Sequence, residues 1–258
     1  MSQLVLTEID NRIGTVRLNR PEKRNALSPK LVEELKQSLR AMEKEDEVKV
    51  VRIKAEGKAF CAGADLAYIQ QLQEFTPAQN LADSKSLMEL FELIYNFPKV
   101  IIAEVQGHAL AGGCGLVTVC DFAFSVPEAL FGFTEVKIGF VPALVSVYLQ
   151  EQIGTAPAQE LLLSGELITS TKAASLGLIT AVAHSDFLEK TVLDFCDKLI
   201  SENSGFSMGE TKKLFRSIHQ NSRIQALRLA AEVNTQARSH EDCKHGIASF
   251  LSKSKPTW

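Results

Sequence analysis

Apolar and polar positions at the start of the chain follow the pattern of two short strands. Residues 4–10 (LVLTEID) and 14–20 (GTVRLNR) each mix apolar and polar side chains over a length typical of a strand. Asp10, Asn11 and Arg12 lie between them and supply residues that favour a tight turn. The pattern therefore predicts a β-hairpin.

After the hairpin the apolar spacing becomes that of a helix. Ser28 suits an N-cap, and Pro29 suits the first helical position, where its missing N–H costs nothing. The apolar stripe of this predicted helix consists of Leu31, Val32, Leu35, Leu39 and Met42. The helix is expected to bury this face.

The same unit then occurs twice: an apolar strand, a loop that contains glycine, and the start of a helix. In the first unit the strand lies within residues 48–57, the loop is 58–65 (KAFCAGAD), and the helix begins at Asp65. In the second, the strand lies within 98–107 and the helix follows the small-residue loop at Gly112. Alternating strands and helices indicate right-handed crossovers and a mainly parallel sheet, which predicts the α/β class.

The remaining pattern divides the chain into a core and a helical end. Residues 121–126 and 129–135 are expected to form short strands, and Gly177 is expected to end a helix. Residues 186–251 are almost wholly helical in pattern. We therefore predict a core at 1–195 and a helical region at 196–258, which packs on its own core or covers another subunit.

Composition narrows the classes of protein that fit. The 258 residues are 45% hydrophobic and 23% charged, as expected of one large globular domain or a domain with an appendage. A net charge of −3 and a pI near 6.0 argue against a surface built to hold nucleic acid. The N-terminal residues lack a basic segment before the apolar positions, so no secretory signal and a cytoplasmic location are expected. No uncharged run reaches the ~18 residues that a membrane span needs.

The two helix starts are the strongest candidates for chemistry. The first N–H groups of a helix have no partner inside it, so two such loops together could bind one carbonyl oxygen as an oxyanion hole. Glycines before a helix also serve close packing, and the sequence leaves both interpretations open. Neither loop matches a nucleotide phosphate motif.

The other motifs give weaker indications of a functional site. Residues 205–209 (GFSMG) match the G-x-S-x-G pattern of serine hydrolases, but they follow a predicted helix end instead of the strand that a nucleophile elbow needs. Among the histidines, His108 is the one expected near the loops. Five cysteines without a C-x-x-C pair indicate neither a disulfide framework nor a zinc site, and they are expected to be small buried residues: Cys61, Cys114, Cys120, Cys196 and Cys243.

Six stretches resemble the enoyl-CoA hydratase/isomerase (crotonase) superfamily in order and spacing. They are NRPEKRNALS, GKAFCAGADL, VQGHALAGGCGL, CDFAF, FGFTEVKIGFVP and ASLGLITAV. The resemblance covers nearly the whole chain and implies a spiral of ββα turns. It also implies a helical C-terminal region that builds a homotrimer or a dimer of trimers, an acyl-CoA thioester as substrate, and no cofactor or metal.

The resemblance also implies roles for individual residues. The N–H groups of Ala64 and Gly112 would hold the thioester oxygen, with Gly113 beside the second donor, and Glu135 would be the acid/base. Taken without the family, Glu135 reads as a partly exposed carboxylate at a strand end. Apolar neighbours on both sides are expected to raise its pKa.

The CoA moiety is expected to contact two parts of the chain. Lys23 and Arg24 would lie near its phosphates, and the backbone of Ala26, Ala62 and Leu66 near its pantetheine and adenine. Asp65 would contact substrate or cap the helix that follows it. Phe250 and Lys253 resemble tail residues that reach the CoA of a neighbouring subunit.

The expected reaction is hydration of a 2-enoyl-CoA. Residues 131–146 most resemble bacterial hydratases for branched substrates such as 3-methylglutaconyl-CoA. Gly115 stands where a two-glutamate hydratase has its first glutamate, so a single-glutamate 3,2-enoyl-CoA isomerase is a rival. A non-catalytic acyl-CoA or RNA binder is the third class, and Glu135 and the acidic pI disfavour it.

Overall fold

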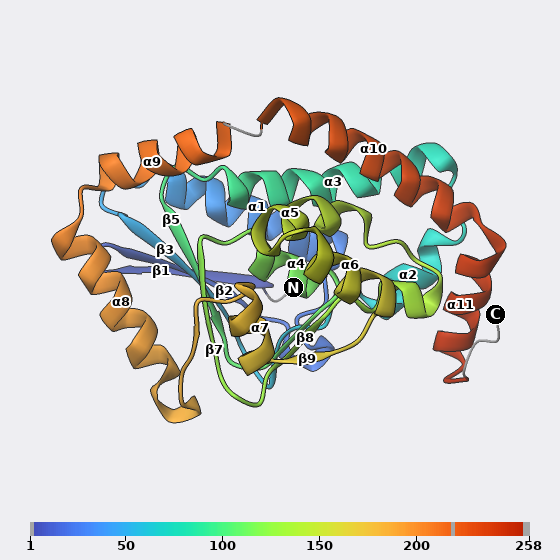
Figure 1. Cartoon of the computed structure of the whole chain (residues 1–258), viewed down its shortest axis with the longest axis horizontal. Coiled ribbons are helices and arrows are strands. Elements are labelled where there is room, and N and C mark those ends of the chain that lie inside the picture. The colour runs from blue at the N-terminus through green and yellow to red at the C-terminus, as the bar shows by residue number, and fades with distance from the viewer. Residues whose placement is uncertain (1–2, 218–219, 255–258) are drawn as a thin grey trace.

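The larger of two β-sheets carries the first strand of each structural repeat (Figure 1). The structure is a computed structural model, and it describes residues 3–217 and 220–254. The sheet order is β1-β2-β3-β5-β7-β10, with β1 antiparallel to β2 and the other neighbours parallel. Its strands are β1 (Val5–Asp10), β2 (Ile13–Leu18), β3 (Val50–Ala55), β5 (Val100–Val105), β7 (Phe122–Ser125) and β10 (Ala181–Val182).

The smaller sheet carries the second strand of each repeat. Its order is β4-β6-β8-β9, and β4, β6 and β8 run parallel. The strands are β4 (Ala59–Cys61), β6 (His108–Leu110), β8 (Leu130–Gly132) and β9 (Ile168–Thr169). Three successive pairs, β3–β4, β5–β6 and β7–β8, thus place one strand in each sheet before a helix or helical turn begins.

The sequence prediction missed β4 and β6, which lie in segments expected to be loops. Each has only three residues, which is too short to show an alternating pattern. The predicted hairpin is confirmed, because β1 and β2 pair from Val5 with Leu18 to Asp10 with Ile13. Its two turn residues, Asn11 and Arg12, have φ of 48° and 67°. Two positive φ values in a two-residue loop match the twist of the flanking strands.

The helices of the core largely follow their predicted starts. The Ser28 hydroxyl accepts the Leu31 N–H at 3.3 Å, which confirms the N-cap. The helix that begins after Asp65 ends at Leu72, and a capping box between Thr76 and Gln79 starts the next one. The core helices are α1 (Pro29–Lys44), α2 (Leu66–Leu72), α3 (Pro77–Tyr95), α4 (Gly112–Thr118), α5 (Ala143–Ile153), α6 (Thr155–Ser164) and α7 (Ser170–Leu176).

The C-terminal part is helical, as predicted. Gly177 ends α7 with φ of 81°, and the chain then forms α8 (Leu188–Glu202), α9 (Gly205–Ser217), α10 (Gln220–Ser239) and α11 (Glu241–Leu251). Helix α10 runs along α3, and α11 lies beside α2 (Figure 1). The predicted boundary at residue 196 falls inside α8, where Cys196 is fully buried.

Helix α9 is fixed to the core by charge pairs. Asp121, just before β7, contacts Lys212 at 2.7 Å and Arg216 at 3.3 Å. The same carboxylate accepts the Ile101 N–H at 2.8 Å. Within 3–217 and 220–254, the structure shows no helix that combines the length and apolarity of a membrane span.

Candidate active site

The first of the two predicted donors, Ala64, lies where the loop after β4 runs beside residues 24–27. The Leu27 N–H donates to the Gly63 carbonyl at 2.7 Å, and the Asp65 N–H donates to the Leu27 carbonyl at 2.9 Å. This parallel bridge uses the neighbours of Ala64 and leaves its own N–H without an acceptor among the described residues.

The second donor, Gly112, is the first residue of α4. Its N–H belongs to the first helical turn and also lacks an acceptor among the residues that the structure describes. Ala111 before it has φ of 49°, a conformation that costs energy for a residue with a Cβ. The Ala111 N–H donates to the Gly132 carbonyl at 2.7 Å, which helps to hold the turn that orients the Gly112 N–H.

Glycines allow the two loops to touch. Gly63 has φ of 87°, and a Cβ there would lie 2.9 Å from the Ala111 Cβ and 3.7 Å from the Gly112 nitrogen. A Cβ at Gly113 would lie 2.2 Å from the Cys61 carbonyl oxygen. The structure shows that these glycines serve close packing of the two loops, and the oxyanion hole stays a prediction.

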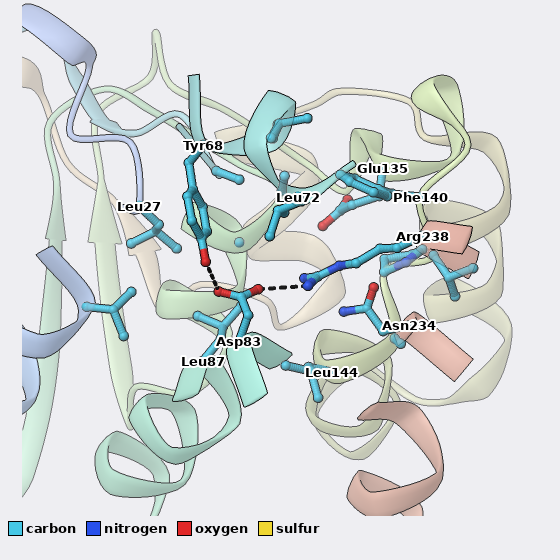
Figure 2. A pocket seen from close by; sticks show the side chains of 18 of the residues that line it. Leu27, Tyr68, Leu72, Asp83, Leu87, Glu135, Phe140, Leu144, Asn234 and Arg238 are labelled. Atoms are coloured by element: carbon cyan, nitrogen blue, oxygen red, sulfur yellow. Dashed lines mark hydrogen bonds and ion pairs between the residues drawn. The ribbon is translucent and has the colours of Figure 1, made fainter. Parts of the chain in front are cut away.

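Both donors and Glu135 line one cavity of about 450 Å³. Most of its wall is apolar, and side chains from α2, α3, α5, α10 and α11 contribute to it. Figure 2 shows Glu135 beside Phe140 on one side of this pocket, and Leu72 and Leu144 among the other labelled residues of its wall. An apolar wall of this kind lowers the local dielectric constant and so strengthens electrostatic interactions beside it.

Glu135 lies in the 3-10 turn η2 (Thr134–Ile138), just beyond β8. Its Oε2 atom is buried and has no hydrogen-bond partner among the described residues. Burial raises the pKa of Glu135 to about 7, against the opposing effect of a hydrogen bond from its own backbone. The carboxylate is therefore suited to take up and release a proton near neutral pH.

The space beside Gly115 is already occupied. A Cβ at this position would lie 2.6 Å from Val145 Cγ1 and 2.8 Å from Phe91 Cζ. A glutamate cannot stand there unless both side chains move. The site thus has one free carboxylate, Glu135, among the described residues of the cavity wall, since Asp83 in the same wall is paired.

The residues expected around CoA form a continuous strip. Ala62 and Leu66 line the cavity, and the Ala62 N–H donates to the Arg24 carbonyl at 3.0 Å. Lys23 and Arg24 are exposed, whereas Ala26 is buried. The roles of these residues toward CoA stay predictions.

Sequence reasoning missed Asn25, which holds this strip in place. Its side-chain amide is buried and donates to the carbonyls of Glu56 at 2.8 Å and Ala59 at 2.9 Å. Its Oδ1 atom accepts the Arg20 N–H at 2.8 Å. Asn25 lies within the stretch NRPEKRNALS, but its two amide contacts are with residues more than 30 positions away, and only the fold reveals them.

Asp65 caps a helix and lies outside the cavity wall. Its Oδ1 accepts the Ala67 N–H at 2.9 Å and the Tyr68 N–H at 3.3 Å, and its Oδ2 pairs with Arg20 at 2.6 Å. Burial alone would raise the pKa of Asp65, but the hydrogen bonds and the Arg20 charge lower it below the usual value. Of the two predicted roles, the structure shows the cap.

The C-terminal helix closes one side of the cavity. Phe250 on α11 lines the cavity of its own chain, where the resemblance predicted contact with the CoA of a neighbouring subunit. Lys253 lies just beyond α11 and is exposed. A Cβ at Gly246 would lie 2.3 Å from the Ile138 carbonyl oxygen, so only glycine lets α11 pack this closely on the turn that carries Glu135.

A polar cluster in the cavity wall was also missed. Tyr68 on α2, Asp83 on α3 and Arg238 on α10 meet there, joined by the dashed contacts of Figure 2. These residues are up to 170 positions apart in the chain. No local pattern relates them.

The remaining candidates lie elsewhere. His108 was expected near the site, but its Nδ1 accepts the Leu130 N–H at 3.1 Å and it does not line the cavity. Ser207 of GFSMG lies inside α9, which agrees with the rejection of a nucleophile elbow. All five cysteines are buried and free, and burial raises the pKa of the Cys61 thiol to about 12. The described residues include no group of three or more His, Cys, Asp or Glu placed to hold a metal ion.

Three kinds of comparison with known proteins point to one family. Residues 8–258 match the family described as enoyl-CoA hydratase/isomerase. A Thermus thermophilus protein provisionally described as an enoyl-CoA hydratase is 39% identical over 244 residues, which cover 95% of this chain and 96% of that protein. The 2,3-dehydroadipyl-CoA hydratase of Escherichia coli is 30% identical over 257 residues, with coverage of 99% and 98%.

A solved structure is similar over nearly its whole length. The crystal structure of an enoyl-CoA hydratase/isomerase from Xanthobacter autotrophicus has a TM-score of 0.90 and 26% identity, and the match covers 98% of this chain and 94% of that chain. This likeness confirms the predicted α/β fold of repeated ββα turns.

Proposed function

The chain belongs to the enoyl-CoA hydratase/isomerase family, and from that premise we propose that this enzyme adds water across the 2,3 double bond of an acyl-CoA thioester. One observation carries the proposal: a buried, unpaired carboxylate lines the same cavity as two backbone N–H groups that have no acceptor among the described residues. The pKa of that carboxylate, Glu135, is raised to about 7.

The N–H groups of Ala64 and Gly112 hold the thioester oxygen. When the oxygen of water bonds to C3, electrons of the double bond move through C2 onto the thioester oxygen, and an enolate forms. Donors already aimed at the oxygen stabilise that charge without reorganisation, and one such donor is typically worth about 3 kcal/mol. This chemistry uses no metal and no redox group.

Glu135 moves the proton. Its carboxylate takes a proton from water while the oxygen of that water attacks C3, and the protonated Glu135 then gives the proton to C2. One water is consumed, one C–O bond and one C–H bond form, and the carboxylate is regenerated. A single carboxylate can therefore complete hydration.

Isomerisation is the second candidate, and the crowded surroundings of Gly115 favour it. Since Phe91 and Val145 exclude a second glutamate, no other unpaired carboxylate in the described wall can hold the water. In a 3-enoyl-CoA, Glu135 would take a proton from C2 and return it to C4. The same enolate forms, so the oxyanion donors serve both reactions.

For the acyl group we propose a branched 2-enoyl chain of the 3-methylglutaconyl type. Residues 131–146 support this proposal through their resemblance to hydratases that act on such substrates. A wall that is mostly apolar also suits a carbon chain of this size.

The test compares the two reactions directly. Wild-type enzyme is incubated with crotonyl-CoA in ¹⁸O-labelled water, and with 3-hexenoyl-CoA in ordinary water. Hydration predicts labelled 3-hydroxybutyryl-CoA and loss of the conjugated enoyl absorbance. Isomerisation alone predicts a rise of that absorbance from 3-hexenoyl-CoA and no label uptake. If neither product forms, the proposed function is wrong.

We further propose a trimer, alone or paired as a hexamer, built through the helical C-terminal region. Helix α9 supports this because Phe206 and Phe215 are 79% and 69% exposed. Large aromatic side chains on one short helix are more often covered by a partner than left in water.

A further inference from the structure

The polar cluster in the cavity wall is a chain of three side chains. The Tyr68 hydroxyl donates to Asp83 Oδ1 at 2.5 Å, and Arg238 Nη1 contacts Asp83 Oδ2 at 2.8 Å (Figure 2). All three residues line the cavity that Glu135 and the two N–H donors also line. The proposed hydration uses none of them.

Arg238 retains unused donors. Its Nη1 serves Asp83 and, more weakly, the carbonyl and side-chain oxygens of Asn80 at 3.3 and 3.4 Å. Its Nε is buried without a partner, and Nη2 donates to no acceptor among the described residues. The side chain is only 9% exposed, so this edge of the guanidinium is largely withdrawn from bulk water.

The unused edge has a specific chemical preference. Nε is buried, so Nη2 is the unused donor that a ligand can reach, and a guanidinium N–H forms a strong charge-assisted hydrogen bond with a carboxylate oxygen. A partly buried donor without an acceptor is costly, and a ligand oxygen at Nη2 relieves that cost. The rest of the nearby wall, with Leu72, Leu87 and Leu144, suits the methylene carbons that would lead to such an oxygen.

We propose that Arg238 binds a second carboxylate at the far end of the acyl group, which selects acyl-CoA substrates derived from dicarboxylic acids. The inference rests on the proposed function, in which the thioester oxygen is held at Ala64 and Gly112. Asp83 keeps Nη1, and the guanidinium lies between the two carboxylates. Tyr68 fixes Asp83 and thereby orients the arginine.

A purely structural role makes a different prediction. If the cluster only ties α10 to α3, then Arg238 affects all acyl-CoA ligands alike. If Arg238 binds a carboxylate, it discriminates between two ligands that differ only at the end of the chain. Glutaryl-CoA and pentanoyl-CoA form such a pair, since both acyl groups have five carbons and are saturated.

The experiment is calorimetric titration of the full-length wild-type protein with each ligand. We expect glutaryl-CoA to bind about tenfold or more tightly than pentanoyl-CoA. Arg238→Met should bring this ratio close to one, and Arg238→Lys should restore part of it. Asp83→Asn removes the competing charge and keeps a partner for Tyr68, so the ratio should stay or rise.

Arg216→Met is the matched control, because Arg216 also forms an ion pair on a C-terminal helix but does not line this cavity. It should leave the ratio unchanged. A wild-type ratio of one or less would overturn the inference without any variant. So would an Arg238→Met protein that loses affinity equally for both ligands.

Failure of the inference and failure of the proposed function are separable, because binding of saturated ligands needs no turnover. A protein that prefers glutaryl-CoA but transforms no enoyl-CoA contradicts the proposed function alone. A protein that hydrates crotonyl-CoA and shows no preference contradicts the inference alone.

Discussion

Phe91 occupies the space into which a side chain at Gly115 would project. A Cβ at Gly115 would lie 2.8 Å from Phe91 Cζ, and Val145 Cγ1 would be closer still at 2.6 Å. The sequence showed only that a glutamate is missing there. The structure shows that its place has been filled by apolar side chains, so Glu135 is the single free carboxylate among the described residues of the cavity wall.

Gly115→Ala should therefore destabilise the protein. Alanine is favoured over glycine inside a helix by about 1 kcal/mol, but forcing a methyl group into a packed core costs typically 1–3 kcal/mol. Urea denaturation should show a lower midpoint. Gly205→Ala is the control, because its Cβ would meet Lys49 no closer than 3.4 Å. Equal midpoints for the two variants would contradict this prediction and show that α4 shifts enough to accommodate the added methyl group.

Glu135→Gln should lower turnover by about 10²-fold or more, because it keeps the shape of the side chain and removes proton transfer. Affinity for acetoacetyl-CoA should change little, since the N–H groups that we propose bind the thioester are untouched. Glu166→Gln, at an exposed carboxylate, is the control. Turnover of Glu135→Gln within tenfold of the wild type would assign the proton to another group.

The raised pKa of Glu135 predicts how the reaction depends on pH. The carboxylate must be ionised to take a proton from water or from C2, so kcat/KM should rise with pH and reach half its plateau near pH 7. The profile of the Glu135→Gln variant should lack this step. A wild-type midpoint near pH 4.5 would show that the carboxylate is well hydrated.

The contribution of Glu135 to the free energy of unfolding should fall as pH rises, whereas kcat/KM rises. The folded-state pKa of Glu135 lies above its unfolded value of 4.5, so the folded state binds the proton more tightly. The stability that this proton contributes is fully present below pH 4.5 and is lost as pH rises through about 7. Glu135→Gln should therefore gain stability relative to the wild type between pH 5 and pH 8 in thermal denaturation. A difference in stability between the two proteins that does not vary with pH would contradict the burial of the Glu135 carboxylate.

The position of Ala64 depends on the carboxylate next to it. Asp65 caps α2 through two N–H groups and pairs with Arg20, so Asp65→Ala should cost about 1–2 kcal/mol in the free energy of unfolding. Because the Ala64 N–H then loses its fixed direction, kcat should also fall. Asp186→Ala, at an exposed side chain, serves as the control. If the Asp65→Ala protein loses stability but keeps its kcat, then the Asp65 cap does not orient the Ala64 N–H for the reaction.

Sequence patterns predicted those parts of the fold that local chemistry determines. Ser28 and Pro29 start α1, Gly177 ends α7, and the long strands are recognisable by their apolar runs. The three-residue strands β4 and β6 were missed, because their pairing is imposed by neighbours in space. Their place in the smaller sheet is what brings the two helix starts together.

The residues of the site also fall into two groups: those that lie in local motifs and those that only the fold brings together. Ala64, Gly112 and Glu135 lie in compact motifs that a resemblance can identify. Asp83 and Arg238 are 155 positions apart and meet only because α10 packs along α3. Phe91 fills the space beside Gly115 because two separate segments of the chain pack together. No local sequence pattern predicts this contact.

The exposed face of α9 gives a prediction about assembly. Phe215 is 69% exposed, although α9 itself is held to the core by Lys212 and Arg216 at Asp121. Anchoring by charges on one side leaves the aromatic side chain available to a second copy of the chain. Phe215→Ser should therefore shift the assembly from a trimer or hexamer toward a monomer in light scattering, with little effect on the fold of the monomer. Leu163→Ser on α6, where the side chain is 77% exposed, is the matched control and should leave the mass unchanged. A wild type that is monomeric at micromolar concentration, or a Phe215→Ser protein with the wild-type mass, would place the subunit contact elsewhere on the surface.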